Sequence, residues 1–152
     1  MRFWRICRRL YAAEAATGEG ARLYGGRWNS RGVRVVYAST SLALAAVETF
    51  VNLEPHLRPA DLVSIEGNIP NQVAVARLDR KALPPNWYRT RDESLRQFPD
   101  EWIRVAESAA LLVPSATIRG EWNMLLNPAH PEFTKIEFRH PEPFEFDARM
   151  FR

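Results

Sequence analysis

The hydrophobic positions of the chain fall into short runs that predict β-strands and one strongly apolar helix. Phe3 to Arg8 has the pattern of a short strand, and Val33 to Ser39 (VRVVYAS) is rich in β-branched residues and follows Gly32. Residues 39 to 41 are Ser, Thr and Ser, which are preferred helix caps, so they predict a helix from Leu42 to Leu53. The sequence of this helix, LALAAVETFVNL, is apolar on nearly every face, which is typical of a buried helix.

The remaining pattern predicts a mixed architecture. Gly18 to Gly32 contains five glycines and predicts a long loop, and Asp92 predicts the start of a helical region that breaks near Pro99 and runs on to Ser108. Further strands are predicted over Leu62 to Ile69, Gln72 to Leu78, Ala110 to Val113 and Lys135 to Phe138. Because strands and helices do not alternate regularly and no repeat or linker divides the chain, we expect residues 1–152 to form one α+β domain, with mixed or antiparallel sheets flanked by helices.

The composition is that of a folded domain, since 46% of the 152 residues are hydrophobic and 26% are charged. No apolar run reaches the roughly 18 to 20 residues that a membrane span needs, and the Arg-rich start is not followed by the apolar stretch of a signal peptide. We therefore expect a cytoplasmic protein without membrane contact. The single cysteine, Cys7, and three dispersed histidines provide neither a disulfide nor a ligand set with zinc spacing, so no metal site is expected.

Arginine dominates the positive charge, since 19 of the 21 basic residues are Arg. A guanidinium group can bond two oxygens of a phosphate or carboxylate, so this bias favours an anionic ligand, although GC-rich coding also enriches Arg. Eight arginines lie in residues 1–34, against only two glutamates. This basic end is either a binding surface for a negatively charged molecule or a solvated face.

Glu48 stands out because it lies within the most apolar predicted helix. Helical spacing places it on one face with Ser41, Leu44, Ala45 and Asn52. A buried carboxylate is costly unless it is paired or hydrogen-bonded. Two interpretations remain open: a structural carboxylate tied to an Arg or to loop amides, and a catalytic or ligand-binding acid.

The loop Tyr24 to Asn29 (YGGRWN) and the following strand carry further candidates. Two glycines let the backbone approach a ligand, and Arg27 follows them, although a glycine pair before Arg is also common in tight turns. Tyr37 shares a strand face with Val35 and Ser39 and precedes the helix of Glu48. A core tyrosine is the alternative interpretation.

A third candidate segment runs from Val113 to Pro131. Ser115 follows a proline at the end of an apolar strand and can point into a cleft, but it lacks the G-x-S-x-G pattern of a serine nucleophile. His130 lies between two prolines, which favours a structural role in a turn.

Together, the segments GGRWNSRGVRVVYASTSLALAAVE and VPSATIRGEWNMLLNPAHPEF strongly resemble the RES domain, the toxin half of bacterial Xre/RES toxin–antitoxin pairs. The resemblance runs from Trp4 to Phe133. The Arg, Glu and Ser that give the family its name match Arg27, Glu48 and Ser115, and the family's tyrosine matches Tyr37 in the same order and spacing.

The resemblance implies a fold similar to that of ADP-ribosyltransferases and an activity that consumes NAD. The reaction would cleave the nicotinamide–ribose bond, with water or phosphate as acceptor, or transfer ADP-ribose to a specific protein. NAD is then a substrate, and no cofactor is implied; the absence of a G-x-G-x-x-G fingerprint argues against hydride transfer. On this interpretation Arg27, with Arg5 on the first strand, grips the diphosphate, and Tyr37 stacks on the nicotinamide cation.

Nicotinamide leaves as a neutral molecule, so one carboxylate is enough for the cleavage. Glu48 would hydrogen-bond a ribose hydroxyl and stabilise an oxocarbenium-like transition state. Ser115 would position the nicotinamide ribose or amide rather than attack it. Asn123 would bind a ribose or order Ser115, unless it merely ties down its loop.

The resemblance also implies a partner, an Xre-type helix-turn-helix antitoxin, and leaves a homodimer within that complex open. The Arg-rich N-terminal region with its aromatic residues offers a different hypothesis, a nucleic-acid-binding surface. A formal net charge of +3 is small for such a surface, so no direct nucleic-acid binding is expected.

Overall fold

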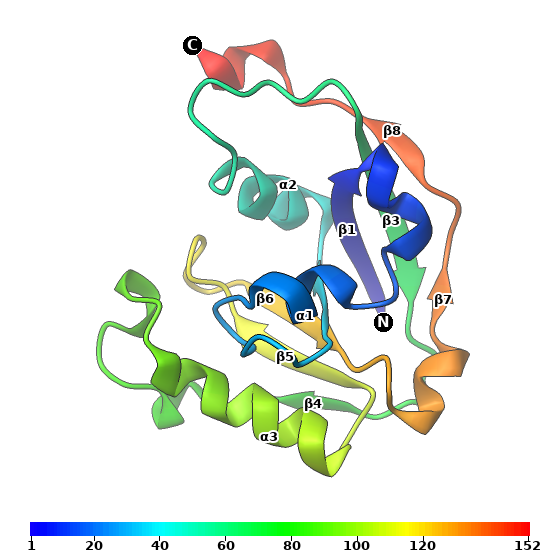
Figure 1. The fold of residues 1–152 in the computed structure, drawn as a ribbon, viewed down its shortest axis with the longest axis vertical. Helices are drawn as coiled ribbons and strands as arrows, with labels where there is room; N and C mark the ends of the chain where they lie inside the picture. Colours follow the sequence, from blue (N-terminus) through cyan, green and yellow to red (C-terminus); the bar gives the residue numbers. More distant parts are fainter.

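The computed structural model describes residues 1–152, and its strands pair into one continuous, strongly curled sheet (Figure 1). The strands are β1 (Arg2–Arg8), β2 (Val36–Ser39), β3 (Leu62–Asn68), β4 (Val75–Arg77), β5 (Ala110–Pro114), β6 (Trp122–Leu126), β7 (Glu137–Phe138) and β8 (Glu142–Phe144). The α-helices are α1 (Glu19–Tyr24), α2 (Leu42–Phe50) and α3 (Gln97–Val105). Short 3-10 turns occupy several of the connections, and none of the helices is long and apolar enough to cross a membrane.

The sheet is mixed, and its order along the main path is β4-β5-β6-β2-β1-β3-β7. Only β4 and β5 pair in parallel, and every other pair is antiparallel. Strand β3 pairs with β8 at its start and with β7 at its end. The expected α+β class is confirmed, with a single curled sheet in place of separate ones.

Strand β5 forms the centre of the core because all five of its residues are buried. Leu111 and Val113 point to the face that α3 covers, where they pack with Leu125 and Trp102. The opposite face holds a second cluster in which Leu112 packs among residues of β2, β6 and the loops beyond. Burial on both faces gives the strands that carry the polar site a rigid support.

Several strand boundaries differ from the predicted ones. Strand β2 begins at Val36, β4 covers only Val75–Arg77, and β7 begins at Glu137, which is where the pairing with β6, β5 and β3 is formed. Two strands were not predicted: β6, which lies between β2 and β5, and β8 at the sheet edge.

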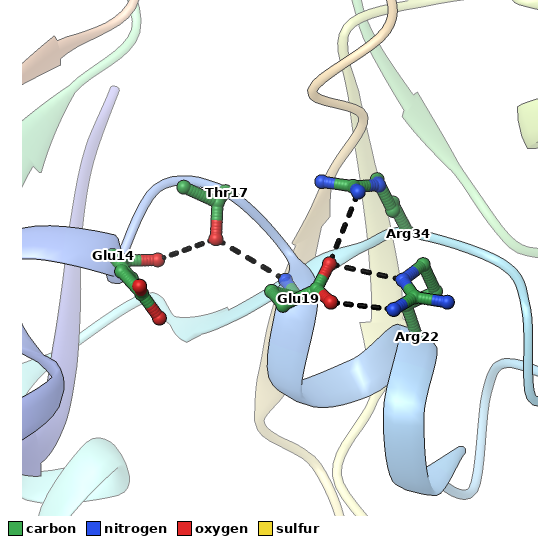
Figure 2. Close-up of polar contacts among 5 residues, drawn as sticks. All are labelled: Glu14, Thr17, Glu19, Arg22 and Arg34. Carbon is green, nitrogen blue, oxygen red and sulfur yellow. Dashed lines mark hydrogen bonds and ion pairs between the residues drawn. The ribbon is translucent and has the colours of Figure 1, made fainter.

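Helix α1 lies inside the segment predicted to be a loop, so that prediction is wrong over Glu19–Tyr24. Figure 2 shows how the helix begins. The Thr17 hydroxyl accepts a hydrogen bond from the Glu19 amide, and the Glu19 carboxylate forms ion pairs with Arg22 and Arg34. A carboxylate in the first turn and its partner three residues later both favour a helix, and glycines with positive φ flank it on each side.

Helix α2 starts at Leu42 as predicted, and the Ser41 hydroxyl caps it by accepting from the Leu44 amide at 3.1 Å. The helix ends at Phe50 instead of Leu53 and is not buried all round, since Leu42 is exposed. The reason is its position: α2 lies across the strands of the sheet as a cover, and Phe50 packs edge-on against Phe146 and Phe151 of the C-terminal segment. Apolar residues of α2 therefore contact both the sheet and the C-terminal segment, and a polar cleft lies between α2 and the sheet.

The helical region after Asp92 also differs from the prediction. Asp92 caps a 3-10 turn by accepting from the Ser94 amide, and α3 follows directly without a break at Pro99. Pro99 is tolerated because it lies in the first turn, where an amide has no partner within the helix. The helix ends at Val105, before Ser108, because Ala106 adopts a left-handed conformation.

Candidate functional site

A cleft of about 610 Å³ opens where β1 and β2 separate. The two strands pair only at Trp4 and Ser39, and α2 lies across them (Figure 1). The cleft is lined by β1, β2, α2 with the residues that follow it, and the loop Gly25–Trp28. Other lining residues are Leu62 of β3, Asn123 of β6, Ala116 and Thr117 in the turn after β5, and Arg91. Candidate residues from both of the sequence segments that resemble the RES domain therefore lie at this cleft.

Glu48 is the only carboxylate that lines the cleft, and three side chains donate hydrogen bonds to it. The Ser115 hydroxyl and the Asn123 amide each donate to Oε1 at 2.6 Å, and the Thr117 hydroxyl donates to Oε2 at 2.9 Å. All three groups act as donors, an arrangement that suits an ionised carboxylate, which only accepts. The structural interpretation of Glu48 predicted an Arg or loop amides as its partners. This prediction is wrong, because two side-chain hydroxyls and one side-chain amide bind Glu48.

Asn123 is fixed in the orientation that serves Glu48. Its Oδ1 accepts from the Ser39 hydroxyl at 2.7 Å, so its Nδ2 faces the carboxylate of Glu48. Ser39 and Asn123 are also partners in the β2–β6 register, which sets their separation. Asn123 therefore orders Glu48 and makes no hydrogen bond to Ser115, which corrects one of its predicted roles.

Ser115 lies behind Glu48 and does not line the cleft. The residue is 1% exposed, and its hydroxyl also accepts from the amides of Thr117 and Ile118 at 3.1 and 2.9 Å. One donor and two lone pairs are thereby used, so the hydroxyl has no capacity left for a substrate. In this structure Ser115 orients the carboxylate, and its hydroxyl is engaged within the protein, which leaves no group for the predicted contact with a nicotinamide ribose or amide.

Tyr37 lines the cleft and also holds the glycine-rich loop. Its hydroxyl donates to Asn29 Oδ1 at 2.7 Å and accepts from the Trp28 amide at 3.1 Å. Asn29 is fully buried, and its Nδ2 bonds three carbonyl groups of the same region. Gly26 is required here, because a Cβ at that position would lie 2.5 Å from the Tyr37 hydroxyl. Burial raises the pKa of Tyr37, so the phenol stays protonated.

We expect Tyr37→Phe to lower the melting temperature by about 2 to 6 °C, because the Trp28 amide and Asn29 Oδ1 would each lose a buried partner. If the ring also stacks on a ligand, Tyr37→Phe should retain more turnover than Tyr37→Ala. Thermal unfolding and steady-state kinetics on the same preparations check both points. An unchanged melting temperature would contradict the role of the hydroxyl in the loop, and equal losses of turnover would remove the ring from the site.

Arg27 and Arg5 face the cleft in different ways. The Arg27 Nη1 donates to the carbonyls of Trp87, at 3.1 Å, and Thr90. Its other guanidinium nitrogens make no hydrogen bond within the protein. Arg5 is more deeply buried: its Nη1 donates to the Tyr37 carbonyl at 2.7 Å where β1 and β2 diverge, and its Nε has no partner. Burial is the main cause that lowers the pKa of both groups.

The other N-terminal arginines are largely neutralised. Four of the eight form ion pairs with carboxylates: Arg2 with Glu66, Arg8 with Asp61, and Arg22 and Arg34 with Glu19. The basic end of the sequence is therefore not one open positive face. His130 has the structural role predicted for it, since its Nδ1 accepts from the Glu132 amide at the start of a 3-10 turn.

Thr117 and Arg91 are site residues that were not predicted from the sequence. Thr117 reaches Glu48 because the turn after β5 folds back over Ser115. Arg91 reaches the cleft from the segment before α3, far from the recognised motifs. Thr117 could have been found from its place two residues after Ser115 in the second quoted segment, whereas Arg91 has no local pattern that marks it, because long-range packing brings it to the cleft.

Comparison with known proteins finds one family over nearly the whole chain. The family model described as the RES domain matches residues 2–147. The Prs ADP-ribosylating toxin of Sphingobium sp. (strain YBL2) is 38% identical over 155 residues, which cover 99% of this chain and 96% of that protein. Toxin Res of Yersinia enterocolitica is 36% identical over 154 residues, which cover 99% of each.

The fold also has a counterpart among solved structures. A chain in the crystal structure of the M. tuberculosis MbcT-MbcA toxin-antitoxin complex matches with a TM-score of 0.70 and 16% identity, over 99% of this chain and 86% of that one. At this identity the likeness establishes the fold alone.

Proposed function

Because this chain belongs to the RES domain family, as its sequence resemblance predicted, we propose that it is the toxin of a toxin–antitoxin pair and that it consumes NAD by cleaving the nicotinamide–ribose bond. In this reaction the bond between ribose C1′ and the nicotinamide nitrogen breaks. Its electron pair stays with nicotinamide, which leaves as a neutral molecule, and C1′ gains oxocarbenium character. An acceptor oxygen then bonds C1′ and loses its proton.

The observation that carries this proposal is the environment of Glu48. It is the single carboxylate of the cleft, and three donors hold it as an acceptor-only group. Such a group cannot protonate a leaving group, but it can hydrogen-bond a ribose hydroxyl and stabilise positive charge that develops at C1′. Nicotinamide needs no protonation, so the chemistry matches the one carboxylate present.

The other cleft residues suit the remaining parts of NAD. The free nitrogens of Arg27 can bond the diphosphate, and Arg5, whose buried Nε has no partner, lines the same cleft. The ring of Tyr37 can stack on the nicotinamide cation. Ser115 and Asn123 act on Glu48, whose position decides whether the charge is aimed at the reacting carbon.

Transfer of ADP-ribose to a protein is the second candidate. The relative that is 38% identical carries the name Prs ADP-ribosylating toxin, which favours this alternative specifically. Both candidates share the cleavage step and differ only in the acceptor. For either one, we propose an antitoxin partner, because the matching solved chain belongs to a toxin-antitoxin complex and because NAD loss harms the cell that makes the enzyme. An Xre-type protein that covers the positive cleft is the partner that fits.

Incubation of the purified protein, freed of any bound partner, with NAD should release nicotinamide, measured by chromatography, in water or in phosphate buffer. NAD labelled in its adenine separates the two candidates: a small labelled product indicates water or phosphate as acceptor, and label retained on a protein in a cell extract indicates transfer. Intact NAD in all three conditions, from several preparations, would refute the proposed function.

A further inference from the structure

The charges of the cleft are unbalanced. Its lining contains four arginines and only one glutamate, and that glutamate already accepts three hydrogen bonds. Of these arginines, Arg8 is paired with Asp61, whereas Arg5, Arg27 and Arg91 form no ion pair. A cleft lined by three guanidinium groups without ion pairs favours an anionic occupant.

Arg27 and Arg91 are close enough to repel each other. The charge of Arg91 contributes to lowering the pKa of Arg27, second only to burial, while Glu48 opposes this effect. Arg27 is half-buried and Arg91 is exposed, and two like charges this close destabilise each other unless a negative group lies between them. A bound anion would supply that group.

The side chain of Arg27 fixes the backbone next to Arg91. Arg27 binds the carbonyl of Thr90, the residue directly before Arg91, and Trp87 of the same segment packs against Trp28 with ring centroids 5.6 Å apart. The Arg91 side chain makes one long hydrogen bond, from Nη2 to Asn52 Oδ1 at 3.3 Å, just beyond the end of α2. Its remaining donors make no hydrogen bond within the protein.

We infer that Arg91 is a second binding residue for a diphosphate, with Arg27 bonding one phosphate group and Arg91 the other. Two planar forks, each able to bond two oxygens, match two adjacent phosphates that each carry one negative charge. The ligand class is a nucleoside diphosphate ester, and its assignment as the diphosphate of NAD rests on the proposed function. Arg91 contributes binding and does not touch the bond that breaks.

The test measures binding of ADP-ribose by calorimetry and the kinetics of NAD cleavage for the wild type, Arg91→Gln and Arg89→Gln. Arg89 is the matched control, because it lies on the same segment and is exposed, but it stacks on Tyr88 and does not line the cleft. Arg91→Gln should weaken ADP-ribose binding by about 10-fold or more, since a charged contact is lost. The KM for NAD should rise by a similar factor with kcat little changed, because the contact is the same in the ground and transition states. Arg89→Gln should stay within about 2-fold of the wild type.

The results separate this inference from the proposed function. ADP-ribose binding that depends on Arg91 in a protein that leaves NAD intact would support the diphosphate site and refute the NAD-cleaving function. Normal NAD cleavage with unchanged KM in Arg91→Gln would overturn the inference alone. Equal losses in Arg89→Gln and Arg91→Gln, or a wild type that does not bind ADP-ribose, would also overturn it.

Discussion

Replacement of Glu48 by Gln should reduce NAD cleavage by about 100- to 1,000-fold and leave the fold intact. Gln retains the size of the side chain and one acceptor oxygen, which can still bond Ser115 and Asn123 at the Oε1 position. Its amide group would face Thr117, whose hydroxyl can rotate to accept instead of donate. Only the negative charge is removed, and this is the charge assigned to the oxocarbenium-like transition state.

Melting temperature and turnover should be measured on the same preparation. A catalytic Glu48 predicts a melting temperature within about 3 °C of the wild type together with the loss of turnover and of toxicity. A purely structural Glu48 predicts the reverse, a melting temperature lowered by several degrees with full specific activity in the folded fraction. Glu48→Ala is the control that should damage both properties, because it leaves the donors of Ser115, Thr117 and Asn123 without an acceptor.

The residues of the site could be recognised from the sequence more completely than their roles. Arg27, Tyr37, Glu48 and Asn123 all line the cleft, as their place in the two motifs predicts. Their contacts could not be predicted, because the hydrogen bonds to Glu48 join residues 67 to 75 positions apart in the chain. The sequence motif suggested that Ser115 contacts the substrate, whereas the fold places its hydroxyl behind the carboxylate.

The elements that were predicted well are those whose pattern is local. The strand ending at Ser39 and the Ser41 cap of α2 depend on β-branched residues and a hydroxyl beside a helix start. Strand β6 was missed because Trp122–Leu126 has no β-branched residue and no regular alternation, and its pairing with β2 and β5 is long-range. Helix α1 was missed because the glycine content outweighed the Glu19–Arg22 pair, which is the signal that predicts it.

Asn123→Asp should give an enzyme whose activity, relative to the wild type, falls as the pH rises, with a loss of about 100-fold in the alkaline range. In the wild type the Ser39 hydroxyl donates to Asn123 Oδ1, and Asn123 Nδ2 lies 2.6 Å from Glu48 Oε1. In the Asp variant one carboxyl oxygen would accept from Ser39, so the other would take the place of Nδ2 and face Glu48. A protonated Asp can donate from that oxygen as the amide does. Two ionised carboxylates cannot remain at this distance, so the pair retains a proton to a higher pH than either group alone would.

The sign of the effect follows from where this proton is held. Because the folded protein retains it and the unfolded chain does not, stability of the Asp variant should be highest at acidic pH and decrease as the pH rises through the titration of the pair. Once the proton is lost, the introduced carboxylate would repel Glu48 and move it away from the reacting carbon. Asn123→Ala is the control: it removes the donor without adding a charge, so its activity relative to the wild type should be reduced by the same factor at every pH. The activity of each variant relative to the wild type should be measured from about pH 5 to 9. If this ratio changes with pH in the same way for the Asp and Ala variants, Asn123 does not orient Glu48 through its N–H group.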